Sequence, residues 1–208
     1  SLALHLQAQG VQPGDRVAAY LPNIPETMVA FLAVVSIGGV WSVCAPDMGT
    51  PAVLDRFSQI TPKVLIAVDG VHYGGKAIDR SQVVQALCAG LPSVQHLLLL
   101  ETPYGQKNAI HTVAACATFH WASSRNDAQT AAFAPESLPF DHPLWIVYSS
   151  GTTGLPKAAM LTHGNLFSAV EIYRVWGEPQ GMIQYGTEKV ICVLPLFHIF
   201  ALITILLR

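Results

Sequence analysis

The sequence predicts an α/β fold, in which a largely parallel sheet is covered by helices on both faces. Short apolar runs with the length of strands alternate along the chain with segments whose apolar residues recur at helical spacing. These runs are apolar at nearly every position, as in strands that are buried on both faces, whereas a half-exposed strand alternates apolar and polar residues. The 208 residues are enough for one large domain or two small ones with a real core.

The first predicted strand covers residues 16–21 and follows the turn signal Gly14-Asp15. A helix is expected next, with Asn23 as its cap, Pro25 in its first turn and Glu26 three residues after the cap. The spacing of apolar residues predicts its buried stripe at Met28, Phe31, Leu32 and Val35.

The chain is apolar, with 51% hydrophobic residues and a mean hydropathy of +0.42, and the segments 27–46 and 190–207 are long enough to suggest membrane spans. Gly38-Gly39 interrupts the first segment and strand-forming residues follow, so we predict a buried helix, a turn and a buried strand. Pro195 interrupts the second, which predicts a strand over residues 189–194 and then a new helix. We therefore expect no integral membrane span, with a membrane-associated or scaffold piece as the alternative.

A second helix is predicted between the turn signals Thr50-Pro51 and Thr61-Pro62. Its apolar face is expected at Val53, Leu54, Phe57 and Ile60. Residues 64–68 form the next predicted strand. Ser81 is the predicted cap of a further helix, and the strand 94–100 follows it.

Between residues 101 and 143 the periodic patterns weaken. We therefore divide the chain into a first α/β subdomain, residues 1–143, and the start of a second subdomain, residues 144–208. The chain begins at Ser1 inside a predicted helix and stops directly after an apolar run. We interpret it as a fragment of a longer protein.

The composition argues against nucleic acid as a partner and against a cysteine-bound metal. The net charge is −2 and only 12% of the residues are charged, so there is no basic field to attract a phosphate backbone. The cysteines lie far apart, without a CxxC pair and among apolar neighbours, so we expect reduced, buried thiols, no metal site and a cytoplasmic protein. They are Cys44, Cys88, Cys116 and Cys192.

A loop rich in glycine and hydroxyl side chains, YSSGTTGLPK at residues 148–157, follows the predicted strand 144–148. Glycines let backbone N–H groups gather around an anion, hydroxyl groups add donors, and Lys157 adds a positive charge. It is not a Walker loop, in which the second glycine adjoins the lysine and a helix follows. Here Ala158 begins a predicted strand and Thr162 caps a predicted helix, so we expect a flap over phosphates, with a plain exposed turn as the alternative.

This loop resembles the signature phosphate-binding loop of the adenylate-forming acyl-activating superfamily, which includes the acyl-CoA synthetases. VLPLFH, residues 193–198, resembles the next signature of that family. Over residues 11–159 the sequence is most similar to the acetoacetyl-CoA synthetase branch, in GVWSVCAPD, VLDRFSQITPKVLIAVDG and YGGK. After residue 159, MLTHGNL and VLPLFHIFAL are more similar to medium- and long-chain fatty acyl-CoA ligases.

The resemblance implies the N-terminal part of the large domain of an AMP-forming acid–thiol ligase. ATP, with Mg²⁺ as cofactor, would activate a small-molecule carboxylic acid as an acyl-adenylate, and CoA would then take the acyl group. Acetoacetate is the acid that the resemblance suggests first, and a medium- or long-chain fatty acid is the alternative. A nucleotide-binding kinase or hydrolase, or a non-catalytic fragment, is the alternative of another class.

The resemblance also implies roles for individual residues. His198 would lie near the acyl pocket, and its alternative is a histidine packed at a strand-to-helix turn. The stretch YGTE at residues 185–188 imitates the adenine and Mg²⁺ motif of the family but precedes VLPLFH, so we predict a surface turn there. The genuine motif and the catalytic lysine are expected beyond residue 208, so the isolated chain should need its C-terminal remainder to form adenylate. The phosphates of ATP would be bound by Ser149, Ser150, Gly151, Thr152, Thr153, Gly154 and Lys157.

Overall fold

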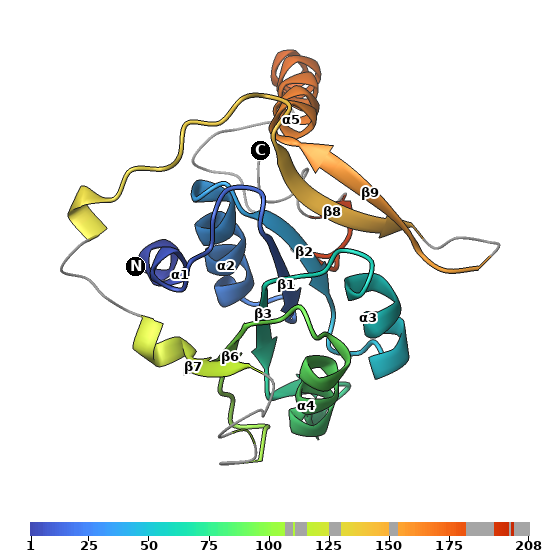
Figure 1. Ribbon diagram of the computed structural model, residues 1–208. Helices are drawn as coiled ribbons and strands as arrows, with labels where there is room; N and C mark the ends of the chain where they lie inside the picture. The colour runs from blue at the N-terminus through green and yellow to red at the C-terminus, as the bar shows by residue number, and fades with distance from the viewer. Residues whose placement is uncertain are drawn as a thin grey trace.

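The computed structural model of the chain describes residues 1–106, 110, 116–124, 130–149, 154–181, 194–199 and 201. Figure 1 shows its helices and strands. The helices are α1 (Leu2–Ala8), α2 (Pro25–Ser36), α3 (Thr50–Phe57), α4 (Ser81–Gly90) and α5 (His163–Gly177). The strands are β1 (Arg16–Tyr20), β2 (Val40–Cys44), β3 (Val64–Val68), β4 (Gly70–Tyr73), β5 (Lys76–Asp79), β6 (His96–Leu100), β7 (Ala117–His120), β8 (Pro143–Ser149) and β9 (Lys157–Thr162).

Seven strands form one sheet in the order β7-β6-β3-β1-β2-β8-β9. Each neighbouring pair is parallel except β8 and β9, which are antiparallel. The central strands β1, β2 and β3 are buried along almost their whole length, as expected where helices cover both faces of a sheet. The predicted α/β class with a parallel-rich, helix-covered sheet is confirmed.

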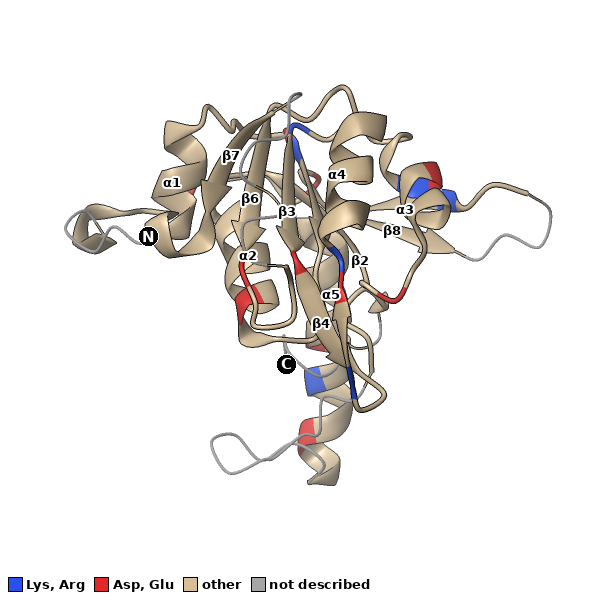
Figure 2. Cartoon of the chain, turned by 90° about the horizontal axis from the view of Figure 1, so that it is seen from below, with Lys and Arg blue, Asp and Glu red and all other residues tan. Residues whose placement is uncertain are grey.

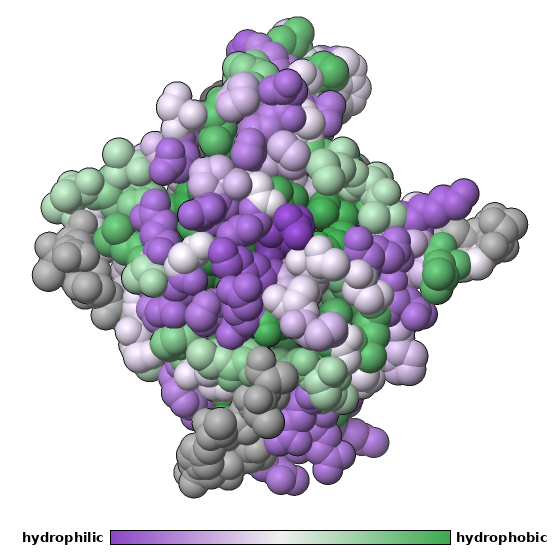
Figure 3. Space-filling view, viewed as in Figure 1, coloured by the Kyte–Doolittle hydropathy of each residue, from purple (hydrophilic) through white to green (hydrophobic). Residues whose placement is uncertain are grey.

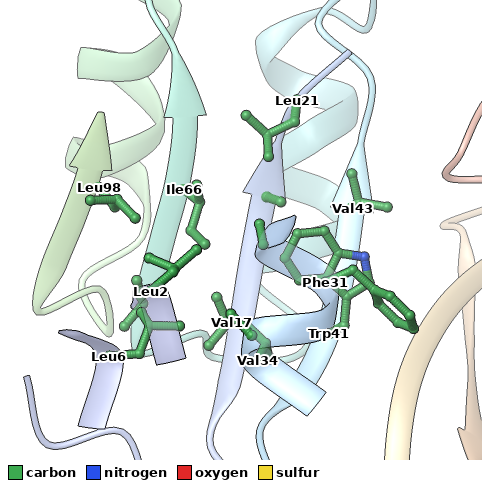
Figure 4. Close-up of a cluster of buried hydrophobic side chains, with 14 of the residues drawn as sticks. Leu2, Leu6, Val17, Leu21, Phe31, Val34, Trp41, Val43, Ile66 and Leu98 are labelled. Carbon is green, nitrogen blue, oxygen red and sulfur yellow. The ribbon is translucent and has the colours of Figure 1, made fainter. Parts of the chain in front are cut away.

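Helices α1 and α2 cover one face of this sheet, and α3 and α4 cover the other (Figure 1). On the first face, Leu6 of α1 and Phe31 of α2 belong to one cluster with Val17, Trp41 and Ile66 of the strands (Figure 4). Successive residues of a strand point to opposite faces. The apolar residues next to Val17, Trp41 and Ile66 in the strands therefore belong to a second core on the other face. The second core includes Ala18, Val53, Phe57, Leu65, Val84, Leu87 and Leu97.

The start of α2 differs from the prediction that Asn23 caps it. The cap residue is Ile24, whose backbone is extended and whose side chain makes no capping bond. Pro25 at the first helical position has no N–H that needs a partner, which reduces the need for a polar cap. The Asn23 side chain instead reaches across the fold to the backbone of Leu194 and Leu196.

The predicted buried stripe of α2 is also partly wrong. Phe31 is buried, but Leu32 is 51% exposed, and Met28 and Val35 are only half-buried. Small side chains occupy much of the buried face, which allows α2 to lie close to α1 and β2. The buried residues of the helix are Thr27, Ala30, Phe31, Ala33 and Val34.

Two other helix limits differ from the sequence prediction. Ser81 is the first residue of α4 rather than its cap, and its backbone N–H and hydroxyl both donate to Asp79 Oδ1, at 3.0 and 2.7 Å. The Asp79 carboxylate therefore satisfies one of the free N–H groups at the start of the helix, that of Ser81 itself. Helix α3 ends at Phe57, and residues 58–60 continue as a turn up to Thr61.

A small antiparallel hairpin of β4 and β5 lies outside the main sheet and was not predicted. Gly74 and Gly75 form its turn with φ values of 57° and 79°, a conformation that glycine adopts without strain. The signal was present in the sequence, because two glycines between strand-forming residues are typical of a two-residue hairpin turn.

The segment 27–46 is confirmed as a buried helix, a turn at Gly38 and a buried strand. Within the described residues, no helix is long and apolar enough to cross a membrane. Figure 2 shows Lys and Arg scattered over several elements of the drawn chain, in agreement with the weak charge of the sequence. The turn predicted at residues 185–188 and nearly all of the strand predicted at 189–194 lie outside the described residues.

We expect Leu65→Ala to lower the free energy of unfolding by about 2–5 kcal/mol, because Leu65 is fully buried in the central strand β3 and its loss leaves a cavity. Leu32→Ala is the matched control. Leu32 is 51% exposed, so the expected loss is at most about 1 kcal/mol. Urea unfolding followed by tryptophan fluorescence would measure both, and equal losses would contradict the two-sided core.

The described cysteines, Cys44, Cys88 and Cys116, carry free thiols. Burial raises the pKa of the Cys44 thiol to about 12. A hydrogen bond with Cys116, together with burial, raises the pKa of Cys88 as well. The same bond lowers the pKa of Cys116, which is only half-buried.

We therefore expect iodoacetamide at about pH 8 to alkylate Cys116 before Cys44 and Cys88. The thiolate is the reactive form, and Cys116 combines the lowered pKa with partial exposure. Peptide mass spectrometry over a time course would measure the order of labelling. Labelling of Cys44 in the folded protein as fast as Cys116 would contradict the burial of β2.

Candidate functional site

The predicted phosphate loop is the connection of a β-hairpin. Strand β8 ends at Ser149 and β9 begins at Lys157, and these two residues are register partners in the antiparallel pair. Gly154 has a φ of 139°, which favours glycine, and no atom of the described residues lies within 4 Å of where its Cβ would be. Ser150, Gly151, Thr152 and Thr153 lie outside the described residues.

The elements that follow the loop are those of a flap rather than of a Walker loop. Lys157 begins a strand, whereas the Walker lysine begins a helix. The next helix, α5, starts after Thr162, whose hydroxyl accepts from the Asn165 N–H while the Asn165 side chain accepts from the Thr162 N–H. The predicted strand and the predicted cap at Thr162 are therefore confirmed.

A cavity of about 520 Å³ lies beside the base of this hairpin. It brings together Ser149, from the start of the predicted phosphate loop, and His198, which we expected near the acyl pocket. Gly154 and Lys157 are not among its lining residues. The cavity is lined by Val43, Cys44, Met48, Arg56, Val147, Tyr148, Ser149, Ala159, Phe197, His198 and Ile199.

Asn23 holds the segment that carries His198. Its Nδ2 donates to the Leu194 carbonyl at 2.8 Å, and its Oδ1 accepts from the Leu196 N–H at 2.9 Å. Leu196 is buried, while the His198 N–H donates to the Pro195 carbonyl in a turn and its side chain stays exposed. The turn between β1 and α2 thus places a histidine that lies far from it in the sequence.

Arg56 is the only charged side chain that lines the described part of this cavity. Its Nη1 donates to the Ala52 carbonyl at 2.6 Å, and its guanidinium carbon lies 5.8 Å from the centroid of the Tyr148 ring. Burial raises the pKa of the Tyr148 hydroxyl, so this group stays protonated beside the cation and can donate. The cavity therefore combines a positive charge, hydroxyl groups and an imidazole with apolar walls, a set that suits an organic anion.

Arg56 was not identified from the sequence. It occupies a polar position of an amphipathic helix, where an arginine is most often simply solvated, and no local pattern indicates its role. Only the packing of α3 beside the end of β8 brings it to Tyr148 and Ser149. The same holds for Asn23, which sequence reasoning assigned to a local cap.

A second, smaller cavity of about 270 Å³ lies at the carboxyl ends of β1 and β2, beside the β4–β5 hairpin. Its lining includes Asn23, Asp47, His72 and Arg80. Arg80 Nε is buried and makes no hydrogen bond with the part of the chain that the structure describes. Ligands of open parallel sheets commonly bind at this edge, so this cavity adjoins the first one at a position suited to a further substrate.

Among the described residues, no group of three His, Cys, Asp or Glu side chains lies close enough together to hold a metal ion. The polar groups of the two cavities are mostly cationic or neutral donors. They suit phosphate or carboxylate oxygens rather than a divalent cation.

Comparison with known proteins agrees with the geometry. The acetoacetyl-coenzyme A synthetase of Rhizobium meliloti (strain 1021) is 42% identical over 159 residues, which cover 76% of this chain and 24% of that protein. The acetoacetyl-CoA synthetase of Mus musculus is 39% identical over 164 residues, covering 78% of this chain and 24% of that protein. The chain thus spans about a quarter of the length of these relatives.

A solved structure has the same fold. The acetoacetyl-CoA synthetase from Streptomyces lividans superposes with a TM-score of 0.71 at 46% sequence identity, over 85% of this chain and 26% of that one. The family model described as AMP-binding enzyme matches residues 1–208, the whole of the chain. The chain therefore belongs to the AMP-binding enzyme family.

Proposed function

We propose that this chain is part of an AMP-forming acid–thiol ligase that activates acetoacetate with ATP and transfers it to CoA. A carboxylate oxygen of the acid attacks the α-phosphorus of ATP, and the bond to the departing pyrophosphate breaks. The thiol sulfur of CoA then attacks the acyl carbon, and AMP leaves with the electron pair of the broken C–O bond. The full activity requires a longer chain, in which the catalytic lysine and the adenine-binding motif are expected beyond residue 208.

The observation that supports this proposal best is the position of the β8–β9 hairpin beside the cavity. Ser149 at one end of the connection faces Lys157 at the other, and Ser149 also lines the cavity that contains His198. The hairpin that we propose as the phosphate site thus adjoins a cavity with mostly apolar walls, which supports a neighbouring acyl site. An enzyme that joins a carboxylate to the α-phosphate needs this arrangement.

In this proposal the hairpin binds the β- and γ-phosphates. Negative charge on these groups grows as pyrophosphate leaves, so the hydroxyl and backbone donors of Ser149 to Gly154 and the ammonium group of Lys157 stabilise the transition state more than the ground state. Mg²⁺ bound to the phosphates would neutralise further charge. Arg56 supplies a further cation, which lines the cavity, and in this proposal His198 borders the space for the acyl group.

Acetoacetate is preferred as the acid because the relatives named above are acetoacetyl-CoA synthetases. The residues after 159 are more similar to fatty acyl-CoA ligases, so fatty acids belong in the test. We also propose a cytoplasmic location, which the free thiols of the described cysteines support.

We expect Lys157→Ala and Thr152→Ala, made in the full-length enzyme, each to slow acetoacetate-dependent ATP–pyrophosphate exchange by about 10- to 1,000-fold, because each removes a donor to the departing group. Lys76→Ala is the matched control. Lys76 is an exposed lysine of the separate β4–β5 hairpin, so its loss should leave the exchange unchanged.

Three outcomes would contradict parts of the proposal. ATP hydrolysis without any acid would favour a kinase or hydrolase. Exchange with medium- or long-chain acids but not with acetoacetate would replace the substrate and keep the reaction. Unchanged ATP–pyrophosphate exchange in both variants would show that the hairpin does not bind the phosphates.

A further inference from the structure

The last turn of α3 and the turn after it contact both ends of the β8–β9 connection. Tyr148 stands directly before the connection, and Pro156 stands directly before β9. Arg56 and Gln59, three residues apart near the end of α3, contact one end each. Two points of a loop that are held from one rigid element have little freedom to move relative to that element.

At the first end, Tyr148 makes two contacts with Arg56, a hydrogen bond and a cation–π contact. The Tyr148 hydroxyl donates to the Arg56 carbonyl at 2.5 Å. The Arg56 guanidinium carbon lies 5.8 Å from the centroid of the same ring, within the range of a cation–π contact. Tyr148 therefore fixes the end of β8 to α3 by its ring and by its hydroxyl.

At the second end, the Gln59 side chain joins the loop to the helix. Its Nε2 donates to the Pro156 carbonyl at 3.0 Å and to the Asp55 carbonyl at 2.6 Å. The first of these bonds spans 97 positions of the sequence, so it is tertiary rather than local.

We propose that Arg56 and Gln59 are positioning residues that hold the two ends of the phosphate-binding hairpin against α3, an inference that rests on the proposed function of that hairpin. The donors of the loop stabilise a departing pyrophosphate only if they already point at it, and a small displacement of such groups is costly. The two contacts supply that orientation from outside the loop. Arg56 also lines the cavity beside Ser149, so its charge can attract an anionic group that binds there.

Gln59→Glu, made in the full-length enzyme, is the decisive variant. It keeps the size of the side chain but replaces the donor by an acceptor that repels the Pro156 carbonyl, so a role in packing alone would tolerate it. We expect kcat of adenylation and kcat/KM for ATP to fall together by about 3- to 30-fold, as for a contact that matters in the transition state. Gln82→Glu, the same change at an exposed position of α4, is the matched control and should leave both constants unchanged.

Tyr148→Phe and Arg56→Lys test the first end. The phenylalanine keeps the ring and loses the hydrogen bond, and the lysine keeps the charge and loses the planar group above the ring. We expect a smaller loss of kcat in each than in Gln59→Glu combined with Tyr148→Phe, since the double variant frees both ends. Thermal melting would verify that each variant is folded.

Hydrogen exchange of the peptide that covers residues 149–157 supplies a readout that does not depend on activity. It should be faster in Gln59→Glu than in the wild type and unchanged in Gln82→Glu. Unaltered exchange of this peptide together with unaltered kinetics would overturn the positioning role. Suppose instead that hydrogen exchange is faster in Gln59→Glu, but the wild-type enzyme shows no acid-dependent ATP–pyrophosphate exchange. That result would support the contact and overturn the proposed function.

Discussion

The pairing of β8 with β2 is the contact on which the candidate site depends. The two strands run parallel, with Trp41 opposite Trp145, and the Ser42 hydroxyl donates to the Ile146 carbonyl at 3.0 Å. Both tryptophans are buried, so a shift of register would turn these large side chains toward the opposite face and disrupt their packing. Because parallel strands end at the same edge of a sheet, this pairing places Ser149 beside the residues that follow β2.

The walls of the cavity come from segments that are distant in the sequence. The end of α3 approaches through Arg56, and the segment 194–199 is held by Asn23. Polar contacts with backbone carbonyl or N–H groups orient both walls, and α3 also packs against the sheet through Val53 and Phe57. No residue of the outer helix α5 lines the described part of this cavity. Figure 3 shows apolar residues on the exposed surface at the top, over α5. The exposed apolar side chains of α5 are Phe167, Ile172, Val175 and Trp176.

The central strands and the β8–β9 hairpin were predictable because their signals are local. The apolar run at residues 64–68 and the order of hydroxyl groups, glycines and lysine at 148–157 depend only on neighbours in the chain. The two wrong cap predictions have a common cause. Asn23 and Ser81 are residue types that favour caps, yet Asn23 bonds to the backbone of a distant segment and Ser81 to the Asp79 carboxylate. The division of the chain at residues 143 and 144 stays a prediction.

The sequence by itself determined the α/β class, the two-sided burial of the central strands and a glycine- and hydroxyl-rich loop that ends in Lys157, since periodicity and turn chemistry operate over a few residues. Only the tertiary structure decided that Ser149 and His198 share one cavity, that Arg56 supplies its charge, and that α3 and the turn after it contact both ends of the loop. The contacts of α3 and its following turn with the loop join residues 92 and 97 positions apart. They follow from strand order and helix packing, which no local pattern encodes.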